Sequence, residues 1–328
     1  LTTRALNYPG PIWVDEVPTY VRPYAIQHYS AGGCVVGQQI YHFPVTGQSS
    51  DYAFTLMSTN TPGSDSLGVL PHTHQLYYES MFGFRGRFQL WAENDGDQET
   101  RILTQGDYGA IPQNVTHTFQ FLDPDTEMVG VVQPGGFDSN LSFSTSSPYD
   151  PLVSANSSSP NASKNSSLQK FDVYAELDFS PRTDAINGAA PMNSTWRTGL
   201  NTLPSDAYTP YFVAKDYGPK YLSTECGYQV IQPFITPTAS GGNFTLSTIT
   251  MDQLSSNVTR FTRHAAFEVL EGQLTILMGG EVLSLLQGDY YSLVAYTKVL
   301  LISQGAEGLD TKLIASATSW NSPVWPAS

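Results

Sequence analysis

Two histidines on alternate residues, followed by a carboxylate and later by a third histidine, form the part of the chain best suited to chemistry. Residues 71–79 contain His72, His74 and Glu79, and His117 follows after a Gly-rich turn. Three imidazoles and one carboxylate are a common ligand set for a first-row divalent metal ion. The chain has only 6 histidines, and half of them belong to this pattern. We therefore predict a mononuclear metal centre built from these four side chains.

The spacing of the four residues predicts that strands position them. Residues i and i+2 of a strand point to the same face of a sheet, so His72 and His74 can both face the inside of a barrel. Glu79 lies an odd number of residues beyond His74, and a turn or bulge must therefore intervene. His117 arrives on a later strand. Burying these groups together without a metal or a proton network would be costly.

The surrounding sequence predicts an all-β fold. Segments rich in β-branched and aromatic residues alternate with turn residues, as is typical of strands. The strands expected in the first half are residues 38–43, 52–59, 84–92, 100–103 and 127–132, together with the strand of His117. Residues 1–30 are rich in Pro and Tyr and predict an extended arm.

The second half of the chain repeats the first. Residues 287–290, Gln-Gly-Asp-Tyr, match residues 105–108 one for one, and residues 244–248 resemble residues 54–59. When the halves are aligned on these repeats, the positions of the four candidate ligands are taken by Val258, Arg260, Ala265 and Val299. The repeat therefore predicts two copies of one β unit, with one metal ion per chain.

The composition changes between the two copies. Residues 154–163 are rich in Ser and Asn, which is typical of a polar linker, and the apolar spacing within residues 168–179 predicts a short helix. We expect an N-terminal domain with the metal site, a glycosylated linker with the short helix, and a C-terminal domain without metal ligands, at residues 1–145, 146–205 and 206–328.

Charge and composition indicate a secreted protein. The net charge of −14 repels nucleic acid and anionic membranes, so neither is expected as a partner. No apolar run approaches the roughly 20 residues that span a bilayer. The chain begins with Leu1 and has no apolar signal core, which predicts a mature extracellular chain whose signal peptide has been removed.

Glycosylation motifs and cysteines agree with that compartment. We expect glycans at the Asn-x-Ser/Thr motifs of Asn140, Asn156, Asn161, Asn165, Asn193, Asn243 and Asn257. Asn114 has the same motif, but a glycan three residues from His117 would be sterically unwelcome. The 2 cysteines, Cys34 and Cys226, are expected to form one disulfide, and two unpaired buried thiols are the alternative.

Residues 72–86 and 106–117 resemble the two sequence motifs of the cupin family. The first motif is matched, from its first histidine onward, by His72, His74, Glu79 and Gly86, and the second by Gly106, Pro112 and His117. Asn114 and Phe121 depart from the second motif, and the upstream Gly of the first is displaced, but no departure touches a ligand position. The chain thus resembles a bicupin, an all-β protein of two jelly-roll β-barrels, with one intact metal site.

Among bicupins, the chain is most similar to the secreted fungal quercetin 2,3-dioxygenases. The resemblance covers the arm, the metal motif, the linker and the ligand-free second barrel. It implies one Cu(II) per chain, held by His72, His74, Glu79 and His117, with a flavonol and O2 as substrates. The central flavonol ring would be opened with release of carbon monoxide to give a depside, and Glu79 would act as the base. The resemblance also allows a homodimer.

Residues expected to alternate inward beside the site predict a substrate pocket. They are apolar, aromatic or soft side chains that suit a flat polyphenol, and equally suit an ordinary barrel core: Tyr41, Met57, Thr59, Phe119, Met128, Val132 and Phe137. Two other functions are weighed against this one. A manganese oxalate decarboxylase or oxidase usually keeps ligands in both barrels, and a storage or sugar-binding bicupin typically keeps them in neither.

Overall fold

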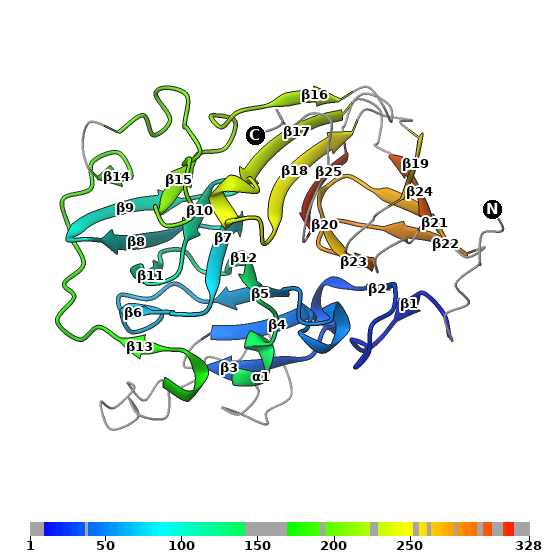
Figure 1. Ribbon diagram of the computed structural model, residues 1–328, viewed down its shortest axis with the longest axis horizontal. Helices are drawn as coiled ribbons and strands as arrows, with labels where there is room; N and C mark the ends of the chain where they lie inside the picture. The colour runs from blue at the N-terminus through cyan, green and yellow to red at the C-terminus, as the bar shows by residue number, and fades with distance from the viewer. Residues whose placement is uncertain are drawn as a thin grey trace.

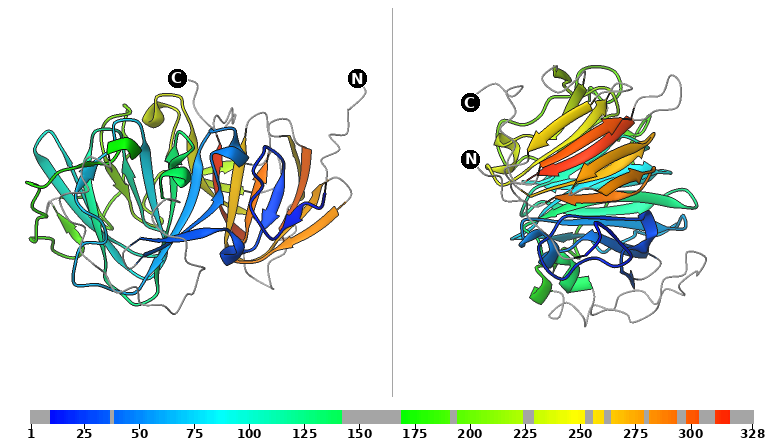
Figure 2. Two further views of the ribbon diagram at one scale, coloured as in Figure 1. Left: turned by 90° about the horizontal axis from the view of Figure 1, so that it is seen from below. Right: turned by 90° about the vertical axis from the view of Figure 1, so that its right-hand side faces the viewer.

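The chain folds almost entirely into strands, which form two β-sandwich halves lying side by side (Figure 1, Figure 2). The computed structural model describes residues 10–36, 39–141, 169–190, 194–223, 229–251, 256–260, 264–278, 281–293, 298–303 and 311–317. Four sheets are present in these residues, two in each half. The predicted all-β bicupin architecture is therefore confirmed, with each half built from facing jelly-roll sheets rather than from a closed barrel.

The first half contains a 7-stranded and a 6-stranded sheet. The 7-stranded sheet has the order β15 (Tyr211–Val213), β10 (Tyr108–Ile111), β7 (Tyr78–Arg85), β12 (Thr126–Gln133), β5 (Thr55–Thr61), β4 (Gln39–Val45) and β3 (Gly33–Val36). The 6-stranded sheet has the order β13 (Tyr174–Ala175), β6 (His72–Thr73), β11 (Thr116–Phe121), β8 (Phe88–Asn94), β9 (Asp97–Leu103) and β14 (Ala189–Ala190). The strands expected at residues 84–92 and 100–103 correspond to parts of β7, β8 and β9, and β8 and β9 pair as a hairpin.

The second half contains an 8-stranded and a 4-stranded sheet. The larger has the order β1 (Trp13–Val14), β2 (Tyr24–Ile26), β23 (Tyr290–Leu293), β20 (Ala265–Glu271), β25 (Thr311–Ala317), β18 (Thr245–Met251), β17 (Gln229–Ile235) and β16 (Tyr221–Ser223). The smaller has the order β19 (Ser256–Arg260), β24 (Lys298–Ser303), β21 (Leu274–Met278) and β22 (Glu281–Leu285).

The two halves exchange strands. Strand β2 of the N-terminal arm pairs with β23 of the second half, with Ala25 opposite Tyr291. In the other direction, β15 pairs with β10 of the first half, with Phe212 opposite Gly109. Strands β13 and β14, which lie in the expected linker, also join the 6-stranded sheet of the first half. The division into residues 1–145, 146–205 and 206–328 stays a prediction, and strands from each part cross it.

The largest buried cluster joins the 7-stranded sheet to the 8-stranded sheet. It includes Tyr78, Phe82 and Val131 from the first half, and Phe234 and Leu246 from the second. Its stacked rings are those of Tyr108 and Phe234, whose centroids lie 4.6 Å apart at an interplanar angle of 15°. Burying apolar area of this kind stabilises association by about 25 cal/mol per Å². The interface between the halves is thus a continuous core.

The repeated Gln-Gly-Asp-Tyr segment makes the same turn in both halves. Asp107 accepts a hydrogen bond from the backbone N–H of Thr104 at 2.8 Å, and Asp289 accepts one from that of Leu286 at 2.9 Å. The preceding glycines have φ values of 90° and 89°, a left-handed conformation that favours glycine. The repeat is therefore structural, because it closes an identical turn whether or not the half carries metal ligands.

Helical structure is limited to short segments. The short helix expected within residues 168–179 is present as a single 3₁₀ turn, Gln169–Phe171, and strand β13 follows it. A five-residue helix that the sequence did not suggest, α1 (Phe137–Leu141), follows β12. None of the helices in the described residues has the length and apolar character needed to cross a membrane.

Candidate metal centre

The four predicted ligands meet inside the first half. Strand β6 carries His72, which pairs in register with His117 of β11. His74 lies in the connection after β6, and Glu79 lies near the start of β7. The expected break between His74 and Glu79 is confirmed, because β6 ends at Thr73 and β7 begins at Tyr78. All four side chains are buried, with exposed fractions between 0% and 8%.

Their ligand atoms converge on one point. The Nε2 atoms of His72 and His74 lie 3.2 Å apart. Glu79 places Oε1 at 3.3 Å from Nε2 of His74 and Oε2 at 3.1 Å from Nε2 of His117. The four ligand atoms all lie within 4.8 Å of one another, and no other group of this kind is present among the described residues.

The outer nitrogen of each imidazole fixes how that ring is protonated. Nδ1 of His72 donates to the carbonyl oxygen of Leu70 at 2.7 Å, and Nδ1 of His117 donates to that of Val115 at 3.1 Å. Nδ1 of His74 donates to the carbonyl oxygen of Asp172 at 2.6 Å. Because a carbonyl oxygen only accepts, each Nδ1 carries the proton and each Nε2 turns a lone pair inward. Three buried lone pairs beside a carboxylate fit a divalent cation.

The charges within the cluster favour the ligating forms of His72 and Glu79. Burial, together with neighbouring His117 and His74, holds the pKa of His72 well below its usual value. Burial alone would raise the pKa of Glu79, but His74 and His117 outweigh it and hold that pKa well below its usual range. For His74, burial is outweighed by Glu79 and Asp172, and the pKa is raised. The site is therefore arranged to hold a positive charge.

The predicted pocket residues all lie buried in the first half. Four of them form one cluster with Cys34 and Phe43, and Tyr77 packs against it: Tyr41, Met57, Val132 and Phe137. Phe119 and Met128 belong to a neighbouring cluster. Thr59 connects the two groups, since it pairs with Tyr41 on one side and with Met128 on the other. Val132 pairs with Glu79, which places this apolar wall next to the ligands.

Helix α1 brings an aromatic ring to the ligands. Asp138 accepts hydrogen bonds from the backbone N–H of Gly47 at 2.8 Å and from Oγ1 of Thr55 at 2.9 Å, which fixes the helix. The ring of Phe137 then lies edge-on to that of His74, with centroids 5.8 Å apart and an interplanar angle of 89°. The ring of Tyr77 contacts Phe137 at 5.4 Å. Sequence reasoning missed Tyr77 and Asp172, because neither belongs to a recognisable motif.

Only one of the two cysteines in the predicted disulfide lies among the described residues. Cys34 lies on β3, is buried, and forms no disulfide with a described residue. Burial raises the pKa of its thiol to about 11. Cys226 lies outside the described residues, so the disulfide stays a prediction.

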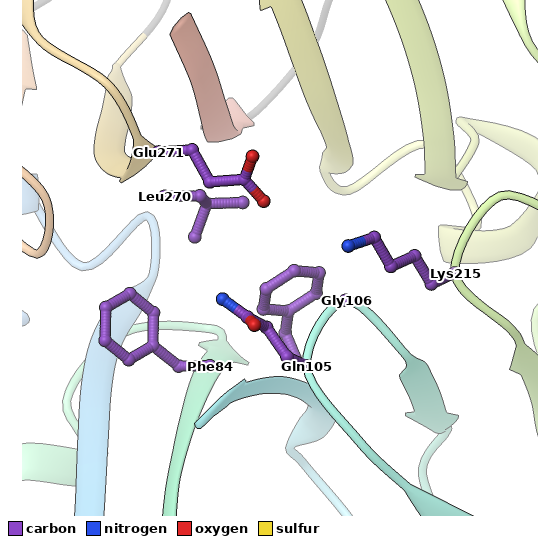
Figure 3. A pocket seen from close by; sticks show the side chains of 7 residues that line it. Phe84, Gln105, Gly106, Lys215, Leu270 and Glu271 are labelled. Carbon is purple, nitrogen blue, oxygen red and sulfur yellow. The ribbon is translucent and has the colours of Figure 1, made fainter. Parts of the chain in front are cut away.

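A separate small pocket lies where the two halves meet (Figure 3). It encloses about 10 Å³ and is lined by Phe82, Phe84, Gln105, Gly106, Lys215, Leu270 and Glu271. None of these residues is a predicted ligand or pocket residue, and the space holds no more than a water molecule.

The fold and the site together define a bicupin whose described residues include a group of three histidines and one glutamate that could hold a metal ion. No established family model matches the chain. Quercetin 2,3-dioxygenase of Aspergillus japonicus is 48% identical over 342 aligned positions, which cover 96% of this chain and 98% of that protein. The chain therefore belongs to the quercetin 2,3-dioxygenase family and is a dioxygenase with a metal cofactor.

Two further similarities are more distant. Quercetin 2,3-dioxygenase of Bacillus subtilis (strain 168) is 25% identical over 125 residues, covering 38% of this chain and 35% of that protein. The crystal structure of Lactobacillus farciminis oxalate decarboxylase in complex with formate superposes with a TM-score of 0.57 at 12% identity, covering 93% of this chain and 88% of that one. A likeness at that identity supports the shared fold alone.

Proposed function

We propose that the protein is a flavonol 2,3-dioxygenase that acts on quercetin or a close relative with O2. Both oxygen atoms enter the product, the central ring opens, and carbon monoxide leaves to give a depside. The observation that carries this proposal is the convergence of three Nε2 lone pairs and the Glu79 carboxylate beside an apolar wall, in a chain 48% identical to a quercetin 2,3-dioxygenase.

We propose that His72, His74, Glu79 and His117 hold one Cu(II) per chain. Imidazole nitrogen suits copper, and the described residues contain a single such group. A bound ion would supply Lewis acidity that lowers the pKa of the flavonol 3-hydroxyl. The buried histidines contribute by presenting neutral Nε2 atoms, since each is held in one tautomer by a backbone carbonyl.

Glu79 is the proposed base that takes the proton from the flavonol 3-hydroxyl. A carboxylate whose pKa is held low by two histidines is a weak base while it stays between them. We therefore propose that Glu79 accepts the proton through an oxygen that is only loosely held at the centre. Its Oε2 atom lies 3.1 Å from His117 and its Oε1 atom 3.3 Å from His74, so each oxygen has a separate neighbour.

The apolar wall supplies the substrate slot in this proposal. Met57, Val132 and Phe137 exclude water from the reacting centre, and dry surroundings protect a reactive oxidised intermediate from side reactions. Tyr41 donates from its hydroxyl to Oε1 of Gln39 at 2.8 Å, which leaves the aromatic face of Tyr41 for packing. Thr59, Phe119 and Met128 extend the same interior surface.

The decisive experiment combines metal analysis, spectroscopy and product analysis on the purified protein. We expect one copper per chain, an EPR signal of Cu(II) that changes when quercetin is added, O2 consumption, and carbon monoxide in the headspace. Protein that consumes O2 with quercetin after complete metal removal would overturn the proposed centre. Oxalate turnover without flavonol turnover would favour the manganese oxalate alternative, for which the apolar wall offers no cationic partner for a small dianion.

Secretion, glycosylation and assembly are further parts of the proposal. Asn243 is exposed, as a glycan acceptor must be. Asn140 lies in α1 and Asn257 in β19, whereas Asn156, Asn161, Asn165 and Asn193 lie outside the described residues. Treatment with an endoglycosidase followed by mass analysis tests the glycans. Sedimentation of the purified protein tests the homodimer.

A further inference from the structure

Asp172 reaches the metal centre from the segment that follows the Ser/Asn-rich linker. Its carboxylate accepts hydrogen bonds from three successive backbone N–H groups of the loop between His74 and Glu79. Oδ2 lies 2.8 Å from the nitrogen of Leu76 and 3.2 Å from that of Tyr77, and Oδ1 lies 3.2 Å from that of Gln75. Hydrogen bonds to an ionised acceptor are about twice as strong as neutral ones.

The same residue also holds a ligand directly. The carbonyl oxygen of Asp172 accepts the Nδ1 proton of His74 at 2.6 Å. Asp172 itself is buried and has a φ of 59°, a left-handed conformation that Asp and Asn adopt more readily than most residues. One residue therefore fixes both the tautomer of His74 and the loop that leads from His74 to Glu79.

The segment around Asp172 is anchored next to the ligand strand. Strand β13 pairs with β6, so that Ala175 lies opposite His72. The backbone N–H of Glu176 donates to the carbonyl oxygen of Pro71 at 2.8 Å. The residues that follow Asp172 thus hold it next to the ligand strand, and its contacts with the loop are not those of a free surface side chain.

We propose that Asp172 is a positioning residue that preforms the metal centre, an inference that rests on the proposed metal site. The loop of residues 75–77 contains no strand pairing of its own, so hydrogen bonds fix the distance and orientation between His74 and Glu79. Asp172 supplies three of them, and two others join the carbonyl oxygens of His74 and Leu76 to residues 114 and 113. The ring of Tyr77, which contacts His74 at 5.8 Å, takes its place through the same bonds. Partners of this kind typically change metal affinity by about 10–100-fold when removed.

The test replaces Asp172 by Gly and measures metal retention rather than turnover. Gly removes the carboxylate but accepts the left-handed backbone, so the substitution separates the side chain from backbone strain. We expect Asp172→Gly to bind Cu(II) about 10–100-fold more weakly than the wild type, and therefore to lose it faster to excess EDTA. The copper hyperfine pattern in EPR should also change, because the geometry of His74 and Glu79 is less restricted.

Two further variants complete the design. Asp172→Asn keeps the left-handed preference and one acceptor oxygen. Its rate of metal loss should therefore lie between those of Asp172→Gly and the wild type. Asp184→Ala is the matched control, since Asp184 lies on the same segment but is exposed and pairs only with Arg182 in the described contacts. It should match the wild type. If Asp172→Gly does not fold, as judged by circular dichroism, the comparison of Asp172→Asn with Asp184→Ala decides the same question.

The outcomes separate this inference from the proposed function. If the wild type retains copper and a folded Asp172 variant loses it at the wild-type rate with an unchanged EPR spectrum, the positioning role is refuted while the centre stands. If the wild type itself retains no metal, the proposed centre fails, and the role of Asp172 fails with it.

Discussion

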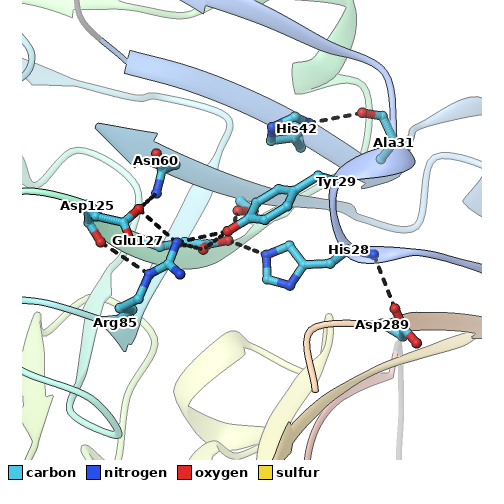
Figure 4. Close-up of polar contacts among 10 residues, drawn as sticks. His28, Tyr29, Ala31, His42, Asn60, Arg85, Asp125, Glu127 and Asp289 are labelled. Atoms are coloured by element: carbon cyan, nitrogen blue, oxygen red, sulfur yellow. Dashed lines mark hydrogen bonds and ion pairs between the residues drawn. The ribbon is translucent and has the colours of Figure 1, made fainter. Parts of the chain in front are cut away.

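His28 Nε2 lies 2.7 Å from Oε1 of Glu127, and this contact ties the N-terminal arm to the centre of the first half (Figure 4). Glu127 is fully buried on β12 and also accepts hydrogen bonds from Tyr29 at 2.8 Å and from Arg85 at 3.1 Å. The backbone N–H of His28 donates to Oδ1 of Asp289 in the second half at 3.2 Å. His28 of the arm therefore bonds both to Glu127 of the first half and to Asp289 of the second.

The first prediction concerns Glu127 and acid stability. Burial would raise the pKa of Glu127, but the hydrogen bond and charge of His28, with help from Ser58 and Tyr29, outweigh it and lower that pKa below 4.5. A lowered pKa contributes stability that is present above pH 4.5 and is lost as the pH falls through the folded-state pKa. Glu127→Gln should therefore lower the free energy of unfolding at pH 7 by about 1–3 kcal/mol.

Urea unfolding of the wild type and Glu127→Gln at several pH values measures this effect. The difference between the two proteins should shrink as the pH falls below 4.5. A difference that stays constant down to pH 3 would show that the substitution acts through packing rather than through charge.

The contribution of Glu268 to the stability of the fold depends on pH in the opposite direction. It is fully buried on β20, where neither carboxylate oxygen makes a hydrogen bond of good geometry with a described residue, and the hydroxyl of Tyr290 beside it lowers its pKa by less than burial raises it. Burial, and then the nearby charge of Glu127, raises its pKa well above 4.5. The stability that a raised carboxyl pKa contributes is present below pH 4.5 and is lost as the pH rises through the folded-state pKa.

Glu268→Gln should consequently become more stable than the wild type as the pH rises. The advantage should grow by roughly 1.4 kcal/mol per pH unit until the folded-state pKa is reached. Thermal unfolding between pH 4 and pH 8 is the measurement. A wild type that is the more stable of the two at pH 8 would contradict a protonated Glu268.

Glu79→Gln tests the base. Gln keeps the size of the side chain and an oxygen ligand but accepts a proton poorly, so we expect O2 uptake with quercetin to fall by about 10²–10⁴-fold. The copper content should stay near that of the wild type, because the three histidines are unchanged. Metal analysis is the control, and turnover near the wild-type rate in a copper-loaded variant would exclude Glu79 as the base.

Phe137→Leu tests the substrate slot. Phe137 lies edge-on to His74 and packs against Tyr77, and its replacement removes aromatic contact while keeping an apolar side chain. We expect KM for quercetin to rise about 3–10-fold, which corresponds to roughly 0.5–1.5 kcal/mol of aromatic contact, with a smaller change in kcat. Steady-state O2 uptake gives both constants. An unchanged KM would place the flavonol away from α1.

Gly288→Ala tests how the arm docks on the second half. A Cβ at Gly288 would lie 1.6 Å from Nδ1 of His28, and the residue has a φ of 89°. Gly242 is the matched control, because its φ is 83° but a Cβ there would meet nothing within 4 Å. Each substitution should cost about 1–2 kcal/mol for the left-handed backbone.

If Gly288→Ala lowers the free energy of unfolding, measured in urea, by more than Gly242→Ala does, the difference is the cost of displacing His28 and the arm. We expect that extra loss to be about 1–3 kcal/mol, as for other overpacked sites. Equal losses at the two positions would mean that His28 moves aside freely.

The local pattern of the sequence was sufficient to predict the ligands and most strands of the first half. Side chains on a strand alternate with a period of two, so the placement of His72 and the burial of Met57, Met128 and Val132 follow from spacing. The repeat separated residues that every copy of the fold needs, such as Gly106 and Gly288, from residues needed only for chemistry. These properties are local, and local properties can be read from a single chain.

The tertiary structure alone decided which residues far apart in the sequence come into contact. Asp172 bonds to a loop 97 residues earlier in the chain, and Glu127 bonds to His28 across 99 residues. The pairing of β2 with β23 and of β15 with β10 likewise depends on how the two halves pack. Such contacts arise when the whole core is assembled, and no periodicity or spacing encodes them. The sequence by itself thus determined the candidate metal ligands, and the folded chain determined which residues hold them in place.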